Sequence, residues 1–336
     1  MTSTTPTTAP AREFSLPLRR LLHARESGVF AALVLLFLLG TVLTPGFAQS
    51  DNLLSVGQQI AQIGIMAVGV TFVIINGEID LSVGSTYALS AISTGMLISD
   101  GWSWPLAMAA GLAVGALAGL LNGLAVVVLG VPSFIVTLGT LSVFRGVALL
   151  ISDGAPISLS SSQEGVAEFN LLGQGELFGV IPMQLVLFTA VAVLGVVLLA
   201  RSRFGFNSYA VGGNQEAARL VGVNVKRVKL TAFVLSGFTA GLAGVLGLSF
   251  LSYVQGVTGQ GLELTVISAV IIGGAALFGG SGTMWGTVIG VAFIGLLQNI
   301  LNIKGISSFW QTVVTGLVIV AAVAADTWQR KRKSRA

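Results

Sequence analysis

The sequence contains no cysteine, a single histidine and few charged residues, and each shortage excludes a kind of site. Of its 336 residues 9% are charged, and cysteine is absent. Without cysteine, neither a disulfide framework nor a thiolate metal site forms. The only histidine, His23, precedes the first apolar segment, so a site built from several histidines is excluded too. We therefore expect no metal site in this chain.

Motifs for nucleotide binding and for hydrolysis are also missing. Glycine is never followed by lysine, so the phosphate-binding loop G-x-x-x-x-G-K-[ST] does not occur. The nucleophile motif G-x-S-x-G is absent as well. We therefore expect neither an enzyme active site nor a cofactor in this chain. Any ATP and Mg²⁺ would be bound by a partner chain.

Long apolar segments are abundant. Hydrophobic residues make up 54% of the chain and gather in continuous blocks long enough to cross a bilayer as helices. A transmembrane β-barrel would show short alternating segments instead, so the predicted fold class is all-α. We predict a polytopic membrane protein with ten transmembrane helices, at residues 29–45, 55–75, 81–99, 104–129, 131–151, 180–200, 229–250, 262–280, 284–301 and 306–326.

The positive charges predict how these helices are oriented. Of the 17 Lys and Arg residues, 15 fall in residues 12–25, 201–229 and 330–335. Positive residues beside membrane spans mark the cytoplasmic side, so both termini and the 201–229 loop are expected there. The acidic segment 152–179 has no Lys or Arg and is expected on the opposite, extracytoplasmic side. The net charge of +4 thus reflects membrane topology, and we expect no nucleic-acid partner.

The same pattern divides the chain into one membrane domain and two tails. Residues 29–326 form the predicted transmembrane domain. Residues 1–28 are expected to be a disordered cytoplasmic tail because they are rich in Thr and Pro, and residues 327–336 a basic cytoplasmic tail. Within the domain, Gly111, Gly115, Gly119 and Gly123 recur every four residues. This spacing predicts a groove for close helix packing, inside the subunit rather than at a dimer face.

Two pairs of segments indicate an internal repeat. "VIINGEIDLSVGST" from residue 73 is similar to "VIIGGAALFGGSGT" from residue 270, and "GLLNGLAVVVLGVPSFIVTLGT" from residue 119 is similar to "GLLQNILNIKGISSFWQTVVTG" from residue 295. The separation between the matched segments is 21 residues shorter in the second half, about the length of one span. Either the repeat is partly inverted, or one apolar block does not cross the membrane fully.

The loop at residues 201–229 contains signals for a short helix. Gly212 and Gly213 are expected to end one element, Asn214 to cap a helix over residues 215–221, and Gly222 to end it. Asn224 suits the cap of the next span. A helix of two turns is too short to be stable alone, so it needs a surface to dock against, either its own neighbours or a partner.

Four ordered motifs carry a resemblance to a known family. They are "GEIDLSVGS" at 77–85, "VPSFIVTLGT" at 131–140 followed by "RGVALLISDGAPI" at 145–157, "AVGGNQEAARLVGVNV" at 210–225 and "VISAVIIGGAALFGGSGT" at 266–283. Together the motifs resemble the permease subunit of ribose-type ABC sugar importers, over about residues 28–326.

The resemblance implies a function, partners and a cellular location. It implies a permease subunit in the bacterial inner membrane that imports a monosaccharide or related carbohydrate. Its implied partners are a cytoplasmic ATP-binding-cassette ATPase, an extracytoplasmic sugar-binding protein, a second permease subunit, identical or similar, and membrane lipid. The residues similar to the family's ATPase-contacting loop are Gly213, Asn214, Glu216, Ala217, Ala218, Arg219 and Gly222. The alternative is a proton-coupled secondary sugar transporter with Glu78 and Asp80 as proton sites.

Charged residues within spans are costly, so Glu78, Asp80, Arg145 and Glu263 are expected to face the pathway, an interface or each other. Asp80 has three interpretations: it caps a helix, contacts sugar or relays protons. Glu78 replaces a glycine of the family motif, so we expect glycine to be tolerated there. Arg145 is a candidate partner for Asp80 or Glu78. The candidate pathway residues, which serve either sugar contact or helix-helix bonding, are Asp80, Ser82, Gln58, Gln62, Asn122, Gln298 and Asn299.

Overall fold

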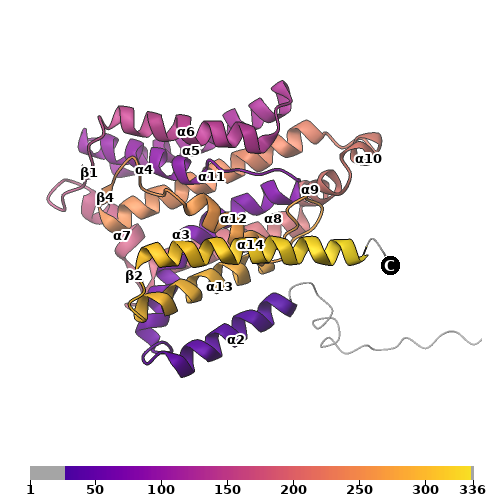
Figure 1. Ribbon diagram of the computed structural model, residues 1–336. Coiled ribbons are helices and arrows are strands. Elements are labelled where there is room, and N and C mark those ends of the chain that lie inside the picture. Colours follow the sequence, from indigo (N-terminus) through magenta and orange to yellow (C-terminus); the bar gives the residue numbers. More distant parts are fainter. Residues whose placement is uncertain (1–26, 334–336) are drawn as a thin grey trace, which may run out of the picture.

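The computed structural model describes residues 27–333 as a bundle of helices (Figure 1). Nearly all of the predicted N-terminal tail, residues 1–26, lies outside the described residues. The helices are α2 (Ser27–Leu43), α3 (Ser50–Ile75), α4 (Val83–Ser99), α5 (Trp104–Leu129), α6 (Ser133–Ile151), α7 (Val166–Gln174), α8 (Met183–Arg201), α9 (Arg203–Gly213), α10 (Gln215–Leu220), α11 (Val225–Leu251), α12 (Leu262–Ile272), α13 (Met284–Ile303) and α14 (Ser308–Lys333). Four strands of two residues each are β1 (Ile157–Ser158), β2 (Glu176–Leu177), β3 (Ile181–Pro182) and β4 (Tyr253–Val254).

A helix lies in each of the ten predicted segments, and the two largest errors in their bounds are at the ends of the 262–280 and 306–326 segments. The 262–280 helix ends at Ile272, because Gly273 and Gly274 follow and Gly274 adopts a left-handed φ of 90°. At about 1.5 Å per residue, α12 is too short to cross a hydrocarbon layer of about 30 Å as a helix. The tail predicted from residue 327 is helical as far as Lys333, as part of α14.

Six helices within the described residues are long and apolar enough to cross a membrane, judged by length and composition. These helices are α3, α5, α6, α8, α11 and α13. Helix α3 lies at the centre, and its residues from Ile63 to Ile75 are all buried. Many of the side chains on α6 and α8 are exposed instead. An apolar surface of this kind is expected where helices meet lipid or a second subunit.

The glycines of α5 make the predicted groove, and α11 fills it within the same chain. A Cβ placed on Gly119 would lie 2.1 Å from the backbone O of Phe233, and one on Gly115 would lie 2.5 Å from that of Gly237. Conversely, a Cβ placed on Gly237 would lie 2.2 Å from the backbone O of Gly115. The prediction of close packing inside the subunit is therefore confirmed.

The two ends of the bundle differ. Helices α9 and α10 lie at one end, and α7, β1 and β4 lie at the other (Figure 1). The predicted loop 152–179 is partly folded: β1 pairs with β4 in antiparallel fashion, and β2 pairs with β3. Helix α7 is anchored by buried Phe169, whose backbone O accepts a hydrogen bond from Ser249 Oγ at 2.7 Å. None of these elements is predicted by the sequence patterns.

The similar segments share a form but not an orientation. In the first pair, both copies are a helix, a break and a helix: α3 and α4 flank residues 76–82, and α12 and α13 flank residues 273–283. In the second pair, the turn before α6 lies at the α10 end, near Gln215. The matching turn after α13 follows Asn299, which bonds Asn52 at the opposite end. The chain is therefore not a simple parallel repeat.

We expect Gly119→Val to destabilise the protein. The added side chain would force α5 and α11 apart, and overpacking of this kind costs about 1–3 kcal/mol. Thermal unfolding of the purified protein in detergent should therefore occur at a lower temperature. Gly139→Val on α6 is the matched control, since a Cβ at Gly139 meets no atom within 4 Å. An equal loss in both variants would show that the α5–α11 contact is not responsible.

Candidate functional site

The break between α3 and α4 is organised by a buried carboxylate. Asp80 Oδ1 accepts hydrogen bonds from Ser82 N at 3.0 Å and from Ser82 Oγ at 2.7 Å. Its Oδ2 accepts one from Ser236 Oγ, on α11, at 2.7 Å. All three residues are at most 1% exposed. Asp80 thus stabilises the turn that starts α4 and fastens this turn to α11.

The same network reaches two more helices. Asn122 Nδ2, on α5, donates to Ser82 Oγ at 2.7 Å, and Thr140 Oγ1, on α6, donates to Asn122 Oδ1 at 2.7 Å. A second link joins the break to α6, because Ser133 Oγ accepts the backbone N–H of Ile79 at 3.1 Å. The polar groups of the break are therefore shared among α4, α5, α6 and α11. The chain of hydrogen bonds fixes how these helices meet.

The predicted pathway residues fall into separate places. Asp80, Ser82 and Asn122 are brought together, as described above. Gln62 lies on α3 and accepts a hydrogen bond from Tyr87 OH at 2.9 Å, while Gln58 contacts Gly173 O at 3.5 Å. Asn299 exchanges two amide hydrogen bonds with Asn52, at 3.0 and 2.9 Å, and its neighbour Gln298 is half-buried on α13.

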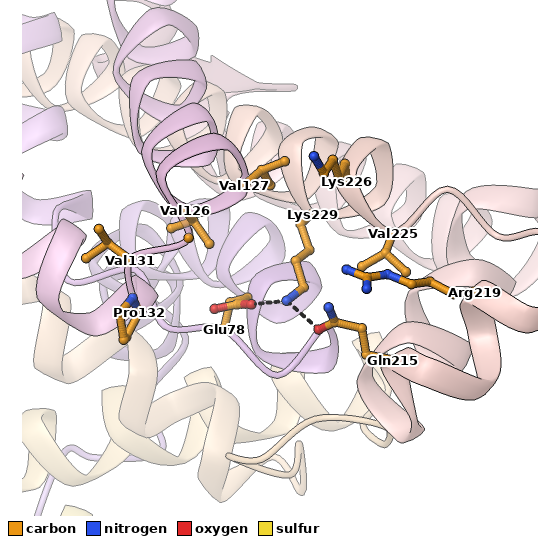
Figure 2. A pocket seen from close by; sticks show the side chains of 11 residues that line it. Glu78, Val126, Val127, Val131, Pro132, Gln215, Arg219, Val225, Lys226 and Lys229 are labelled. Carbon is orange, nitrogen blue, oxygen red and sulfur yellow. Dashed lines mark hydrogen bonds and ion pairs between the residues drawn. The ribbon is translucent and has the colours of Figure 1, made fainter.

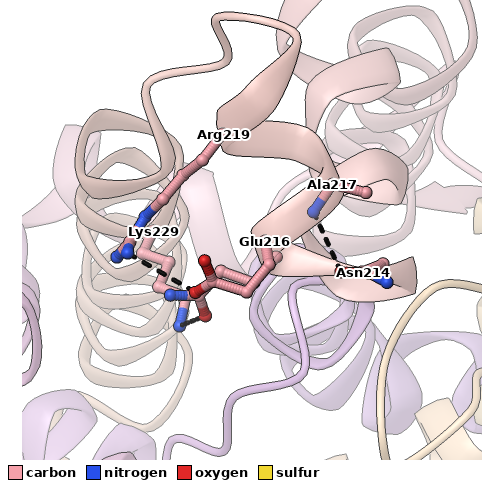
Figure 3. A network of polar contacts seen from close by, with 6 residues as sticks. Asn214, Glu216, Ala217, Arg219 and Lys229 are labelled. Carbon is pink, nitrogen blue, oxygen red and sulfur yellow. Dashed lines mark hydrogen bonds and ion pairs between the residues drawn. The ribbon is translucent and has the colours of Figure 1, made fainter.

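The short helix α10 forms as the sequence predicts. Asn214 Oδ1 accepts the N–H of Ala217 at 3.0 Å, which caps the helix (Figure 3). Gly222, with a φ of 85°, ends it, and Asn224 caps α11 by accepting the N–H of Arg227 at 3.0 Å. The next span begins at Val225, earlier than predicted. Helix α9, which precedes Asn214, was not predicted.

Helix α10 has a docked face and a free face. Ala218 is buried against Val211, Val225 and Val228, which attaches the helix to α9 and α11. Leu220 and Val221 point away and are 89% and 79% exposed. Glu216 and Arg219 form a long, exposed ion pair at 3.5 Å, which contributes little (Figure 3). The predicted coupling residues thus lie on one small unit, with an uncovered apolar pair at its tip.

Glycines let the end of α9 approach the breaks at residues 76–82 and 273–283 with its backbone against theirs. A Cβ on Gly212 would lie 1.8 Å from Ile75 O and 2.6 Å from Gly280 N. Gly280 N also donates to Ile75 O at 2.9 Å, and Tyr209 OH donates to Gly282 O at 2.6 Å. The end of α9, the end of α3 and the loop before α13 therefore meet at one junction.

A pocket lies between α10, α11 and the turn before α6. Lys229 Nζ sits inside it, 2.5 Å from Glu78 Oε1 and 2.9 Å from Gln215 Oε1 (Figure 2). Val126, Val131 and Pro132 are among the apolar residues that line the pocket. Neither Lys229 nor Gln215 is predicted from the sequence as a partner of Glu78, because no local pattern links them to it.

The predicted partnership of Arg145 with Asp80 or Glu78 is wrong. Arg145 Nη1 donates to the backbone O atoms of Gly256 and Thr258, at 2.8 and 2.6 Å. Glu263, which is also buried, lies near enough to interact electrostatically with the guanidinium. Among the described residues, no three His, Cys, Asp or Glu side chains are grouped closely enough to hold a metal ion.

Comparisons with known proteins show the family to which the chain is similar. A family model described as "Branched-chain amino acid transport system / permease component" matches residues 52–323. The ribose import permease protein RbsC of Bacillus subtilis is 42% identical, with 90% of this chain and 92% of the relative covered. The L-arabinose transport system permease protein AraH of Escherichia coli is 37% identical, with 92% of each covered. The autoinducer 2 import system permease protein LsrC of an Enterobacter species is 35% identical, with 95% and 91% covered.

We expect Asp80→Ala to destabilise the helix break. The substitution leaves three buried donors without their acceptor, and each such loss costs about 1–3 kcal/mol. Asp80→Asn keeps an acceptor oxygen and should lose less. Thermal unfolding in detergent measures both effects, with Asp100→Ala, at an exposed carboxylate, as the control. If Asp80→Ala unfolded at the same temperature as the control, the network would not have the stabilising role given to it.

Proposed function

This chain belongs to the family of transport-system permease components described above, and we propose that it is the permease subunit of an ABC importer for a monosaccharide or related carbohydrate. In this proposal a separate ATPase binds ATP and Mg²⁺, an extracytoplasmic protein delivers the sugar, and two permease subunits enclose the path. The ATPase acts through α10.

The uncovered apolar pair on α10 carries the proposal. A helix of six residues has little stability of its own, yet α10 is capped, docked and directed outward. Leu220 and Val221 are exposed at the end of the bundle where positive residues cluster, the side expected to be cytoplasmic. The chain lacks a phosphate-binding loop. An ATPase partner gives this apolar surface a cover and supplies the energy for transport.

A carbohydrate suits the polar groups of the interior better than an amino acid does. An amino acid has an ammonium and a carboxylate group, which favour fixed charges of opposite sign, whereas a sugar needs neutral donors and acceptors. Asp80 is occupied by Ser82 and Ser236, and Arg145 by two backbone carbonyls. The side chains near Asp80 are the hydroxyls of Ser82 and Ser236 and the amide of Asn122. The relatives named for ribose, L-arabinose and autoinducer 2 support the same choice.

The proposed topology has ten crossings in the bacterial inner membrane, with both termini in the cytoplasm. The shorter helices α2 and α4 contribute two of them, and α12 contributes one together with the non-helical residues 273–283. The α7 end, where Glu164 and Glu168 are exposed, then faces the binding protein. The exposed apolar surface of α6 and α8 contacts lipid and the second permease subunit.

Transport by the reconstituted complex tests the proposal. Proteoliposomes that contain this chain and its partner ATPase, with binding protein and ATP supplied on opposite sides, should take up labelled ribose or arabinose only when ATP is hydrolysed. Uptake by this chain alone, driven by a pH gradient, would contradict the proposal. That result would identify the alternative, a proton-coupled secondary sugar transporter.

We expect Leu220→Asp to weaken ATPase binding. Replacing an exposed apolar anchor at an interface centre by a charge should lower affinity by about thirtyfold, and ATP-driven uptake should fall with it. Co-purification and titration of the ATPase in detergent measure the loss. Phe178→Asp is the control, because Phe178 is 88% exposed but lies between β2 and β3, at the end of the bundle opposite α10. Equal binding of the ATPase by Leu220→Asp and the unmodified chain would remove α10 as the contact.

A further inference from the structure

Glu78 lies where α10 approaches the Asp80 break, which is the non-helical stretch at residues 76–82 between α3 and α4. The residue is two positions before Asp80, in the stretch without helical hydrogen bonding between α3 and α4. Its carboxylate faces Lys229 at 2.5 Å, and the same ammonium binds Gln215, the first residue of α10, at 2.9 Å (Figure 2). One side chain on α11 therefore holds both the short surface helix and the break.

We propose that Lys229 is a positioning residue that couples movement of α10 to the Asp80 break, by binding Gln215 and Glu78 at the same time. The inference rests on the proposed function, since it concerns how ATP-driven movement reaches the interior. It also revises the expectation that glycine can replace Glu78, because glycine would remove one of the two partners of Lys229.

The burial of the pair distinguishes it from an ordinary surface contact. The side chains of Lys229 and Glu78 are 14% and 12% exposed, whereas those of Arg219 and Glu216 are 51% and 78% exposed. A partly buried ion pair is screened less by salt and holds a more defined geometry than an exposed pair. Glu78 is the only acidic residue that lines the described pocket. Lys229 therefore has a single carboxylate with which it can pair in this pocket.

Two contacts attach neighbouring elements to the Asp80 break, so the break is expected to move with them. The glycine junction joins Gly212 and Gly280 to Ile75 at the start of the break, and Lys229 joins Glu78 three residues later. Beyond Glu78, Ile79 and Asp80 bond to α4, α6 and α11. Displacement of Gln215 thus reaches the interior network along a short, continuous path.

The pocket gives α10 space in which to move. It has a volume of about 280 Å³ and lies between Arg219 and Gln215 of α10 on one side and the turn at Gly130–Pro132 on the other. A tightly packed contact would resist displacement of the helix. An open pocket bridged by one long, flexible lysine lets α10 shift while the link is kept.

The experiment measures sugar transported per ATP hydrolysed by the complete complex in proteoliposomes. For Lys229→Met and Glu78→Gln, we expect ATP hydrolysis to persist and transport per ATP to fall about tenfold, the size of a typical coupling between sites. The exchanged pair Glu78→Lys with Lys229→Glu should recover transport per ATP to within about twofold of the unmodified complex. Gln215→Ala keeps the ion pair and cuts only the link to α10, so it should also lower the ratio.

Controls separate this role from a structural one. Lys226→Met removes another positive charge from the same pocket and should leave transport per ATP unchanged. Thermal unfolding of each variant shows whether it is folded, and Gln215→Ala tests the proposal even if the charge variants fail to fold. An unchanged ratio in Gln215→Ala or Lys229→Met, or no recovery in a folded exchanged pair, would overturn it. Failure of the proposed function is distinct, because then the unmodified complex shows no ATP-driven uptake.

Discussion

Helix α4 begins in the buried interior of the bundle, and the Asp80 carboxylate accepts the backbone N–H and the hydroxyl of Ser82, the residue that precedes the helix. A helix start in an apolar interior is costly unless its polar groups are bonded. Asp80 meets part of this requirement by accepting from the backbone N–H of Ser82, and it also accepts from the hydroxyl of Ser236. Because Ser236 belongs to α11 and Ser82 is bonded to α5, satisfying one turn also sets the positions of the surrounding helices.

The glycines serve the same interior in another way. Where α5 crosses α11, and where Gly212 meets Ile75, backbones approach closely enough that no Cβ fits between them. Contacts of this kind are rigid because they have no side chain that can adopt another rotamer. The Lys229 link is the opposite kind of contact, since it uses a long side chain across an open pocket. A rigid glycine junction thus holds the end of α9, and the flexible Lys229 side chain holds the adjoining helix α10.

Local rules were sufficient for much of the fold. Apolar blocks located ten helices, and cap chemistry located α10 through Asn214 and Gly222. The end of α12 was missed because apolar residues continue through Phe278, although the backbone turns at Gly274. The partners of Glu78 and Arg145 were missed because Lys229 and Gly256 are far away in the sequence, and spacing carries no information about such pairs. The sequence placed Asp80 at a helix start, but Ser236 is visible only in the fold.

The α5–α11 crossing also has a consequence for the order in which the protein is made. Helix α5 ends at Leu129, and α11 does not begin until Val225, so the ribosome completes α6 and α8 in between. During that interval Gly115 and Gly119 lack the α11 backbone against which they pack, and lipid or the insertion machinery must cover this part of the groove. The energetic cost of this delay is small, because the glycines of the groove expose no polar side chain to lipid. Assembly of the interior is therefore a late event of synthesis, and it depends on two helices finding each other across a membrane already occupied by their neighbours.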